Sequence, residues 1–323
     1  MVSLSNHRMV GYLFAGQGSQ YVGMGKDLYD SFEQAKTIFE QADKVLGFSI
    51  SELCFNGPPE ELTKTGNCQP AILTVSIAAY EAFKAMHVIP KAMHVIPAKA
   101  GIYASPSFMA GLSLGEYSAL VAAGALNFQD AVYLVWRRGQ FMEEAAARYP
   151  GKMLSVIGLD LAKVKEICAE VKAEVANINC PGQVVISGSV ESISRARALA
   201  KEKGAKLAVE LEVSGAFHSS LMQGASLKLA QELEKINISF PKFPVICNVT
   251  GKPVLTAQEI KQNLIQQVST SVLWEDSMKF ILSNGVNSFI EFGPGKVLKG
   301  LMRRIDSSAQ VVNIEKKEDV FKL

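Results

Sequence analysis

A G-x-S-x-G pattern at residues 111–115, Gly-Leu-Ser-Leu-Gly, places the strongest constraint on the fold. A strand-like run at residues 107–110 precedes it, and a helix-like run at residues 116–125 follows it. This order is typical of a nucleophile elbow, a strand-to-helix turn so tight that a Cβ at either glycine would collide with its neighbours. Backbone N–H groups there, including that of Leu114, can face a developing oxyanion. The pattern predicts an α/β fold with Ser113 as nucleophile; a glycine turn without chemistry is the alternative.

The composition is that of a globular protein, with 48% hydrophobic and 20% charged residues among 323. This length suits one large domain with a smaller one inserted. The net charge of only +2 argues against a dedicated nucleic-acid binder. No apolar run is long enough to span a bilayer, and residues 1–8 lack the hydrophobic region of a signal peptide. We therefore expect a cytoplasmic protein that binds neither nucleic acid nor membranes.

The five cysteines are scattered along the chain and include no C-x-x-C pair. Such spacing favours neither a zinc site nor a disulfide framework, so we expect reduced thiols and no metal. The cysteines are Cys54, Cys68, Cys168, Cys180 and Cys247.

Runs of apolar residues divide the chain into a body and an insert. Residues 149–214 follow the order β-α-β-β-α-β, the ferredoxin-like pattern of a small subdomain within a larger α/β body. The predicted strands are residues 10–14, 153–159, 174–178, 183–188, 205–213, 245–248 and 288–292. The predicted helices are residues 31–45, 69–86, 116–125, 130–147, 162–170, 191–203, 219–235 and 256–267. The predicted divisions are a discontinuous body at 9–148 and 215–310, the subdomain at 149–214, an N-terminal extension at 1–8 and a C-terminal tail at 311–323.

The heptapeptide KAMHVIP occurs twice in tandem, at residues 84–90 and 91–97. Two copies of so short a unit do not make a repeat architecture. We expect the duplication only to lengthen the connection between a helix and the next strand.

A serine nucleophile needs a base, and the chain has four histidines. Three of them lie in the polar N-terminal segment or in the duplicated connector: His7, His87 and His94. Only His218 stands at a strand-to-helix junction of the body, so we predict that it activates Ser113. No aspartate stands out as a third member, so a backbone carbonyl or Asn248 is expected to hold the imidazole.

The loop after the first predicted strand, residues 16–20, has the sequence Gly-Gln-Gly-Ser-Gln. A Rossmann loop is excluded because Tyr21 stands where the third glycine belongs. A Walker A loop is excluded because Lys26 is followed by Asp27 and not by Ser or Thr. The loop instead suits a side-chain or backbone donor aimed at an oxyanion.

Two adjacent arginines, Arg137 and Arg138, interrupt an otherwise apolar predicted helix. A solvated pair of charges is one interpretation. The other is an arginine that projects from an apolar surface and holds a carboxylate bidentately in a dry pocket.

Eight motifs in this order resemble the malonyl-CoA:acyl-carrier-protein transacylase family, which includes the acyltransferase domains of polyketide synthases. They extend from residue 10 to about residue 305, over nearly the whole chain. The matching stretches are FAGQGSQ at 14–20, QPA at 69–71, GLSLGEYSAL at 111–120, RGQFM at 138–142, NINCPGQVVISG at 177–188, AFHS at 216–219, NVT at 248–250 and EFGPGKVL at 291–298. The resemblance implies an α/β-hydrolase-like body with an inserted ferredoxin-like small subdomain.

The resemblance also implies roles for individual residues. Ser113 would be the acylated nucleophile and His218 its base. Gln17 and the N–H of Leu114 would form the oxyanion hole, and Arg138 would pair with the free carboxylate of the malonyl group. The implied substrate pocket comprises Gln69, Met142, Asn179 and Phe217.

For Phe217 and Asn248 the resemblance implies more specific roles. Phe217 would crowd an α-methyl group and so favour malonyl. The main-chain carbonyl of Asn248 would orient His218.

The implied reaction transfers malonyl from malonyl-CoA to the phosphopantetheine thiol of acyl carrier protein, in fatty-acid synthesis, by a ping-pong route without metal or redox cofactor. The expected partners are malonyl-CoA and the carrier protein, and the chain is expected to be a monomer. The alternatives are a trans-acting malonyltransferase of a polyketide synthase, a serine esterase and a non-catalytic carrier-binding module. A simple esterase has no use for a buried cation beside its nucleophile.

Three residues depart from the family pattern. Many members carry His where this chain has Leu112. Ser271 and Leu273 replace the proline and arginine of the family's P-V-R-W stretch. Loss of that arginine would change the affinity if it steadies the wall near the acyl site or helps to bind CoA.

Overall fold

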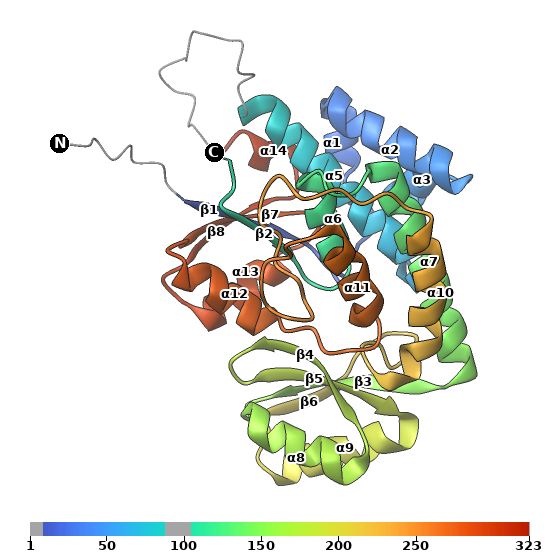
Figure 1. Cartoon of the computed structure of the whole chain (residues 1–323), viewed down its shortest axis with the longest axis vertical. Helices are drawn as coiled ribbons and strands as arrows, with labels where there is room; N and C mark the ends of the chain where they lie inside the picture. The colour runs from blue at the N-terminus through green and yellow to red at the C-terminus, as the bar shows by residue number, and fades with distance from the viewer. Residues whose placement is uncertain (1–8, 88–104, 323) are drawn as a thin grey trace, which may run out of the picture.

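The structure is a computed structural model that describes residues 9–87 and 105–322. The predicted N-terminal extension at 1–8 and the second copy of the duplicated heptapeptide at 91–97 lie outside the described residues. Two sheets organise the rest, one in the body and one in the small domain (Figure 1).

The body is built on a parallel sheet of order β2-β1-β7-β8. Its strands are β1 Val10–Phe14, β2 Phe108–Gly111, β7 Ser288–Phe292 and β8 Gln310–Ile314. All five residues of β1 are buried, as expected for a central strand of a parallel sheet with both faces covered.

Helices cover both faces of this sheet (Figure 1). Tyr12 and Phe14 point to the larger core under α2, α5 and α7, whereas Leu13 points to a second core under α12 and α13. This alternation follows from the period of two in a strand. The body helices are α1 Lys26–Ser31, α2 Glu33–Leu46, α3 Ile50–Asn56, α4 Pro59–Thr63, α5 Thr65–His87, α6 Gly115–Ala122, α7 Phe128–Arg148, η1 Ser220–Met222, α10 Gln223–Glu234, α11 Ala257–Gln267, α12 Trp274–Ser283, α13 Val297–Ile305 and α14 Lys317–Val320.

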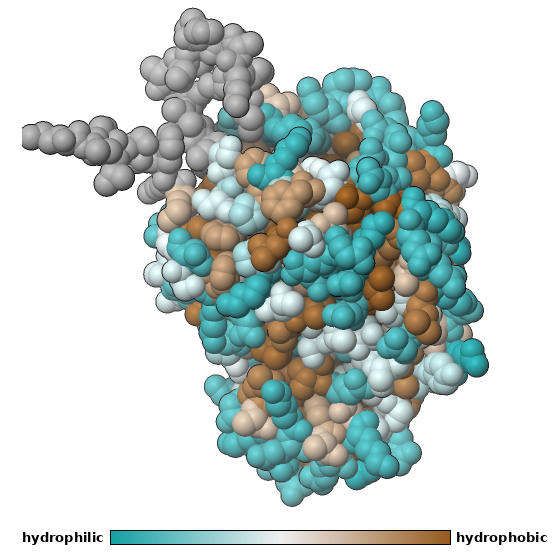
Figure 2. All heavy atoms as spheres, viewed as in Figure 1, coloured by the Kyte–Doolittle hydropathy of each residue, from teal (hydrophilic) through white to brown (hydrophobic). Residues whose placement is uncertain are grey.

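The insert has the predicted order β-α-β-β-α-β, which is confirmed. Its elements are β3 Gly151–Ile157, α8 Leu161–Val171, β4 Glu174–Cys180, β5 Gln183–Ser189, α9 Val190–Glu202 and β6 Leu207–Glu210. The strands form an antiparallel sheet of order β4-β5-β3-β6, with α8 and α9 packed on the face that carries Leu154, Val156 and Ile186. The opposite face looks toward the body (Figure 1), and Figure 2 shows hydrophobic residues reaching the surface between the two parts.

Two predictions about the body are wrong. Residues 245–248 form only isolated bridges, Met109 with Val245 and Ile246 with Pro253, because the backbone of Asn248 bonds instead to the Glu116 side chain and to Leu273. Residues 311–323 are not a tail, since β8 continues the body sheet in parallel register with β7. This edge strand is five residues long and half exposed, so its apolar pattern is weak.

Among the described residues, no helix is long and apolar enough to cross a membrane.

Candidate active site

The elbow predicted at residues 111–115 connects β2 to α6. A Cβ at Gly111 would lie 2.0 Å from the backbone of Gly115, and one at Gly115 would lie 2.2 Å from the carbonyl oxygen of Phe14. Ser113 has φ 51°, a left-handed conformation that side-chain-bearing residues rarely adopt. Such strain at a nucleophile is typical of functional turns.

We expect Gly111→Ala to destabilise the fold by about 3 kcal/mol or more, because the backbone it would meet cannot move aside. Denaturant unfolding of the purified variant measures this, and failure to accumulate as folded protein counts as the same result. Gly224→Ala is the matched control, since a Cβ at this helical glycine has nothing within 4 Å. Its free energy of unfolding should change by no more than about 1 kcal/mol. Equal stability of the two variants would contradict the tight-turn argument.

Ser113 and His218 are in hydrogen-bond contact, with 2.8 Å between Oγ and Nε2. The other ring nitrogen, Nδ1, lies 2.7 Å from the main-chain carbonyl oxygen of Gln267. A carbonyl only accepts, so Nδ1 carries the proton and Nε2 is free to accept one from the serine. Burial is the main cause that lowers the pKa of His218 to about 4, and the charge of Arg138 adds to it. The imidazole is therefore neutral at pH 7, the state that a general base requires.

The expectation that Asn248 orients the histidine is wrong. Its carbonyl accepts from the Leu273 N–H at 2.8 Å, while its side chain accepts from the Ser113 N–H at 2.6 Å and donates to the Gly111 carbonyl at 2.8 Å. Asn248 thus fastens the elbow rather than the base.

A backbone carbonyl orients the base, as one of the two expectations has it, and it belongs to Gln267, a residue that no sequence motif indicated. Gln267 is the last residue of α11, where helix carbonyls have no partner within the helix and carry partial negative charge. That carbonyl can therefore accept from Nδ1 of His218 and favour the imidazolium formed during reaction. The only sequence signal was that the predicted helix at 256–267 ends at this residue.

Arg138 lies within the apolar part of α7 and is 1% exposed. Its Nη1 donates to Gln69 Oε1 at 2.7 Å, and its Nη2 donates to Ser113 Oγ and to Gln267 Oε1, each at 3.1 Å. Its Nε has no hydrogen-bond partner among the described residues, and the guanidinium forms no ion pair within 4.0 Å with a described carboxylate. Burial lowers the pKa of Arg138. A guanidinium nevertheless stays protonated in proteins, so a buried cation reaches the nucleophile with no described carboxylate in direct contact with it.

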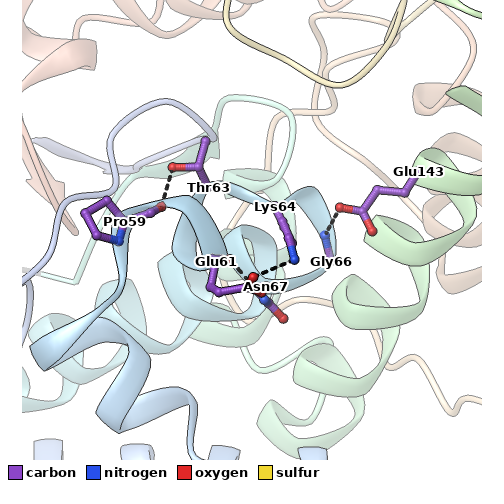
Figure 3. A network of polar contacts seen from close by, with 7 residues as sticks. All are labelled: Pro59, Glu61, Thr63, Lys64, Gly66, Asn67 and Glu143. Atoms are coloured by element: carbon purple, nitrogen blue, oxygen red, sulfur yellow. Dashed lines mark hydrogen bonds and ion pairs between the residues drawn. The ribbon is translucent and has the colours of Figure 1, made fainter. Parts of the chain in front are cut away.

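Close packing of α5 on α7 sets the position of this cation. A Cβ at Gly139 would lie 2.6 Å from the Thr65 carbonyl oxygen, so the helices approach closely there. The Gly66 N–H donates to the carboxylate of Glu143 on α7 at 3.1 Å. Figure 3 shows this contact between the two helices. The α4–α5 corner is held by further bonds among Glu61, Lys64 and Asn67 (Figure 3). These contacts place Gln69, one turn into α5, against Arg138.

A cavity of about 470 Å³ opens above the Ser–His pair, between the body and the small domain. Of the residues predicted for the site, those that line it are Gln17, Ser113, Met142, Asn179, Phe217 and His218. Gln69, Arg138, Leu114 and Asn248 lie behind this lining and are fully buried. The Gly16–Gln17 turn is pressed on the elbow, because a Cβ at Gly16 would lie 2.5 Å from the Leu112 carbonyl oxygen.

The departing stretch at residues 271–273 joins the body to the small domain. Val272 exchanges backbone bonds with Ala176 and Ile178 of β4, and Ser271 Oγ donates to the Val175 carbonyl oxygen at 2.5 Å. Ser271 therefore supplies a hydrogen bond between the domains that a proline, which has no hydroxyl group, could not make.

The site combines a neutral histidine with a strained serine, on an α/β body with a small antiparallel domain above it. This combination defines a serine-dependent acyl-transferring enzyme. The model of the acyl transferase domain family matches residues 11–318, and the chain belongs to that family.

Named relatives resemble the chain over nearly its whole length. It is 45% identical over 316 residues to the malonyl CoA-acyl carrier protein transacylase of Bacillus subtilis, covering 96% of this chain and 95% of the relative. A solved transacylase of the same name from Coxiella burnetii superposes with a TM-score of 0.90 at 38% identity, covering 97% and 96% of the two chains. A malonyl-transacylase solved in complex with a type II PKS acyl-carrier protein gives a TM-score of 0.89 at 39% identity, covering 97% and 98%.

Proposed function

We propose that this chain transfers the malonyl group of malonyl-CoA to the phosphopantetheine thiol of acyl carrier protein through a malonyl-Ser113 intermediate. The observation that carries the proposal is Arg138, a fully buried cation 3.1 Å from the nucleophile with no described carboxylate in direct contact with it. A dicarboxylic half-thioester brings a carboxylate that can contact this cation directly, whereas a simple ester brings none. The names of the relatives support the same substrates.

The proposed mechanism has two symmetrical halves. His218 takes the proton of Ser113, whose Oγ attacks the thioester carbon. Donors from Gln17 and the Leu114 N–H are proposed to hold the tetrahedral oxyanion until CoA leaves as the thiol. The carrier thiol then gives its proton to His218, attacks the malonyl ester and restores the serine.

The remaining pocket residues are proposed to select the acyl group. Phe217 lines the cavity next to the base, where it would crowd an α-methyl substituent. Asn179 lines it from β4, and its buried Oδ1 has no partner among the described residues, so it can accept from an amide of the substrate. Gln69 and Met142, joined by an Nε2–Sδ contact of 3.4 Å, support Arg138.

The proposed chemistry requires malonyl-CoA and a reduced carrier thiol but no resident cofactor, and we place it in the cytoplasm. Supply of extender units for fatty-acid synthesis is the primary proposal. Supply to a polyketide carrier is the second candidate, favoured by the similarity to the transacylase solved with a type II PKS carrier.

Intact-protein mass after mixing with malonyl-CoA tests the function, with acetyl-CoA run in parallel. We expect one malonyl adduct on the wild type and none on Ser113→Ala, because no other nucleophile among the described residues is in contact with His218. The adduct should discharge onto a holo acyl carrier protein, and competing fatty-acid and polyketide carriers in one reaction would rank the two candidates. Consumption of malonyl-CoA without transfer to either carrier would instead indicate a hydrolase.

A further inference from the structure

The polar network around Ser113 contains a carboxylate that the proposed mechanism does not use. Glu116 lies in the first turn of α6, three residues after the nucleophile, and is 1% exposed. Its Oε2 accepts from the Asn248 N–H at 2.9 Å and from Gln267 Nε2 at 2.7 Å. It therefore contacts both the residue that fastens the elbow and the residue that orients the base.

Gln267 connects this carboxylate to Arg138 through one side-chain amide. Its Nε2 donates to Glu116, and its Oε1 accepts from Arg138 Nη2 at 3.1 Å. An amide can serve an anion only with its NH₂ and a cation only with its oxygen, so the two charges together fix its orientation. Glu116 is thus the countercharge of Arg138 across a single bridging residue.

The other titratable groups near this pair are neutral at pH 7. Burial raises the pKa of the Cys247 thiol to about 12 and raises the pKa of Tyr117 above its usual value, while the pKa of His218 is lowered to about 4. Where Glu116 is ionised, the unloaded site therefore holds one cation and one anion. A malonyl carboxylate bound at Arg138 would add a second anion to the same dry region, where two carboxylates cannot both remain ionised cheaply.

We infer that Glu116 is the counter-ion of Arg138 in the unloaded site and takes up one proton from solvent when a malonyl carboxylate replaces it. The inference rests on the malonyl transfer proposed above. Acylation itself conserves protons, because the serine proton leaves on the CoA thiol. The additional proton adds to the Glu116 carboxylate and returns to solvent when malonyl passes to the carrier.

In the free enzyme, Glu116 already begins to take up a proton near neutral pH. Burial raises the pKa of Glu116 to about 7, despite the opposing hydrogen bonds from Asn248 and Gln267 and the charge of Arg138. A nearby second anion raises it further. Glu116 would then act as a specificity-determining positioning residue, since it never touches the acyl group and responds only to acyl groups that carry a carboxylate.

The direct test is a single turnover of the wild-type full chain at pH 8 in weak buffer with an indicator dye. We expect about one proton taken up per malonyl-Ser113 formed, with the acyl-enzyme quantified by intact mass, and none per acetyl-Ser113. Acylation by malonyl-CoA without proton uptake would overturn this inference while leaving the proposed function intact. Failure of malonyl-CoA to acylate Ser113 would overturn both.

A second test uses Glu116→Gln, which keeps an oxygen for Asn248 and Gln267 but has no charge. In the wild type, the ratio of malonyl to acetyl acylation rates should fall as pH rises above 7, by up to about tenfold per pH unit. In Glu116→Gln this ratio should not change between pH 6 and 9. Persistence of the wild-type pH dependence in this variant would overturn the inference.

The matched control is Glu232→Gln, another buried carboxylate, which is bonded to Tyr133 and Lys235 away from the site. It should retain the wild-type pH dependence. If Glu116 had a purely structural role, Glu116→Gln would slow acylation by malonyl-CoA and by acetyl-CoA equally. The ratio of the two rates would then keep its wild-type pH dependence, which would also contradict the inference.

Discussion

His218→Ala is expected to slow acylation of Ser113 by about 10³-fold, because the variant removes the only base in contact with the nucleophile among the described residues. The residual rate would come from the oxyanion donors and the bound substrate alone. Rapid quench of malonyl-CoA turnover, with the acyl-enzyme quantified by mass, measures the rate constant. His87→Ala is the matched control, since that histidine lies at the end of α5 against α14. Comparable rates in the two variants would remove His218 from the mechanism.

The pH profile gives an independent readout of the same histidine. Since the pKa of His218 is lowered to about 4, its neutral form persists well below pH 6.5, the ordinary value for histidine. Acylation by acetyl-CoA, which brings no carboxylate, should therefore stay level as pH falls from 8 to about 5.5, and decline only below that. A decline centred near pH 6.5 would show that the imidazole is not buried and neutral as described.

Much of the site could be predicted because its signals are local. The elbow glycines are required by backbone contacts near 2 Å, so a short pattern identifies the turn and its serine. Arg138 stands out because a cation interrupts the apolar face of α7. The small domain follows from strands and helices whose periodicities alternate within about 65 residues.

The features that the sequence did not predict depend on contacts that are not specific to any residue type. Gln267 orients His218 through its main-chain carbonyl, which every residue has, and the contact exists only because α11 ends beside the base. Asn248 lies at the site, but its side chain contacts the elbow, and its carbonyl accepts from Leu273 and not from His218. The edge strand β8 is held in the sheet by its pairing with β7, whereas its own pattern of apolar residues is weak.

The substrate preference depends most on Arg138. Arg138→Ala is expected to lower malonyl acylation by about 10²- to 10³-fold, because the malonyl carboxylate would be desolvated without a charged partner at a cost of about 3 to 4 kcal/mol. Acetyl acylation should fall far less, since an acetyl group has no carboxylate to hold. Single-turnover rate constants for the two thioesters, measured side by side, give the ratio that tests this.

Two further variants separate charge from geometry. Arg137→Ala removes the neighbouring arginine, which stacks on Phe141 and bonds to Gln140, and it should leave the malonyl-to-acetyl ratio unchanged. Arg138→Lys keeps a cation but loses the planar fork that reaches Gln69 and Gln267 together, so we expect it to recover only part of the malonyl rate. If Arg138→Ala slowed both thioesters equally, the arginine would be a structural support of the Ser–His pair, and the buried cation would no longer indicate a dicarboxylic substrate.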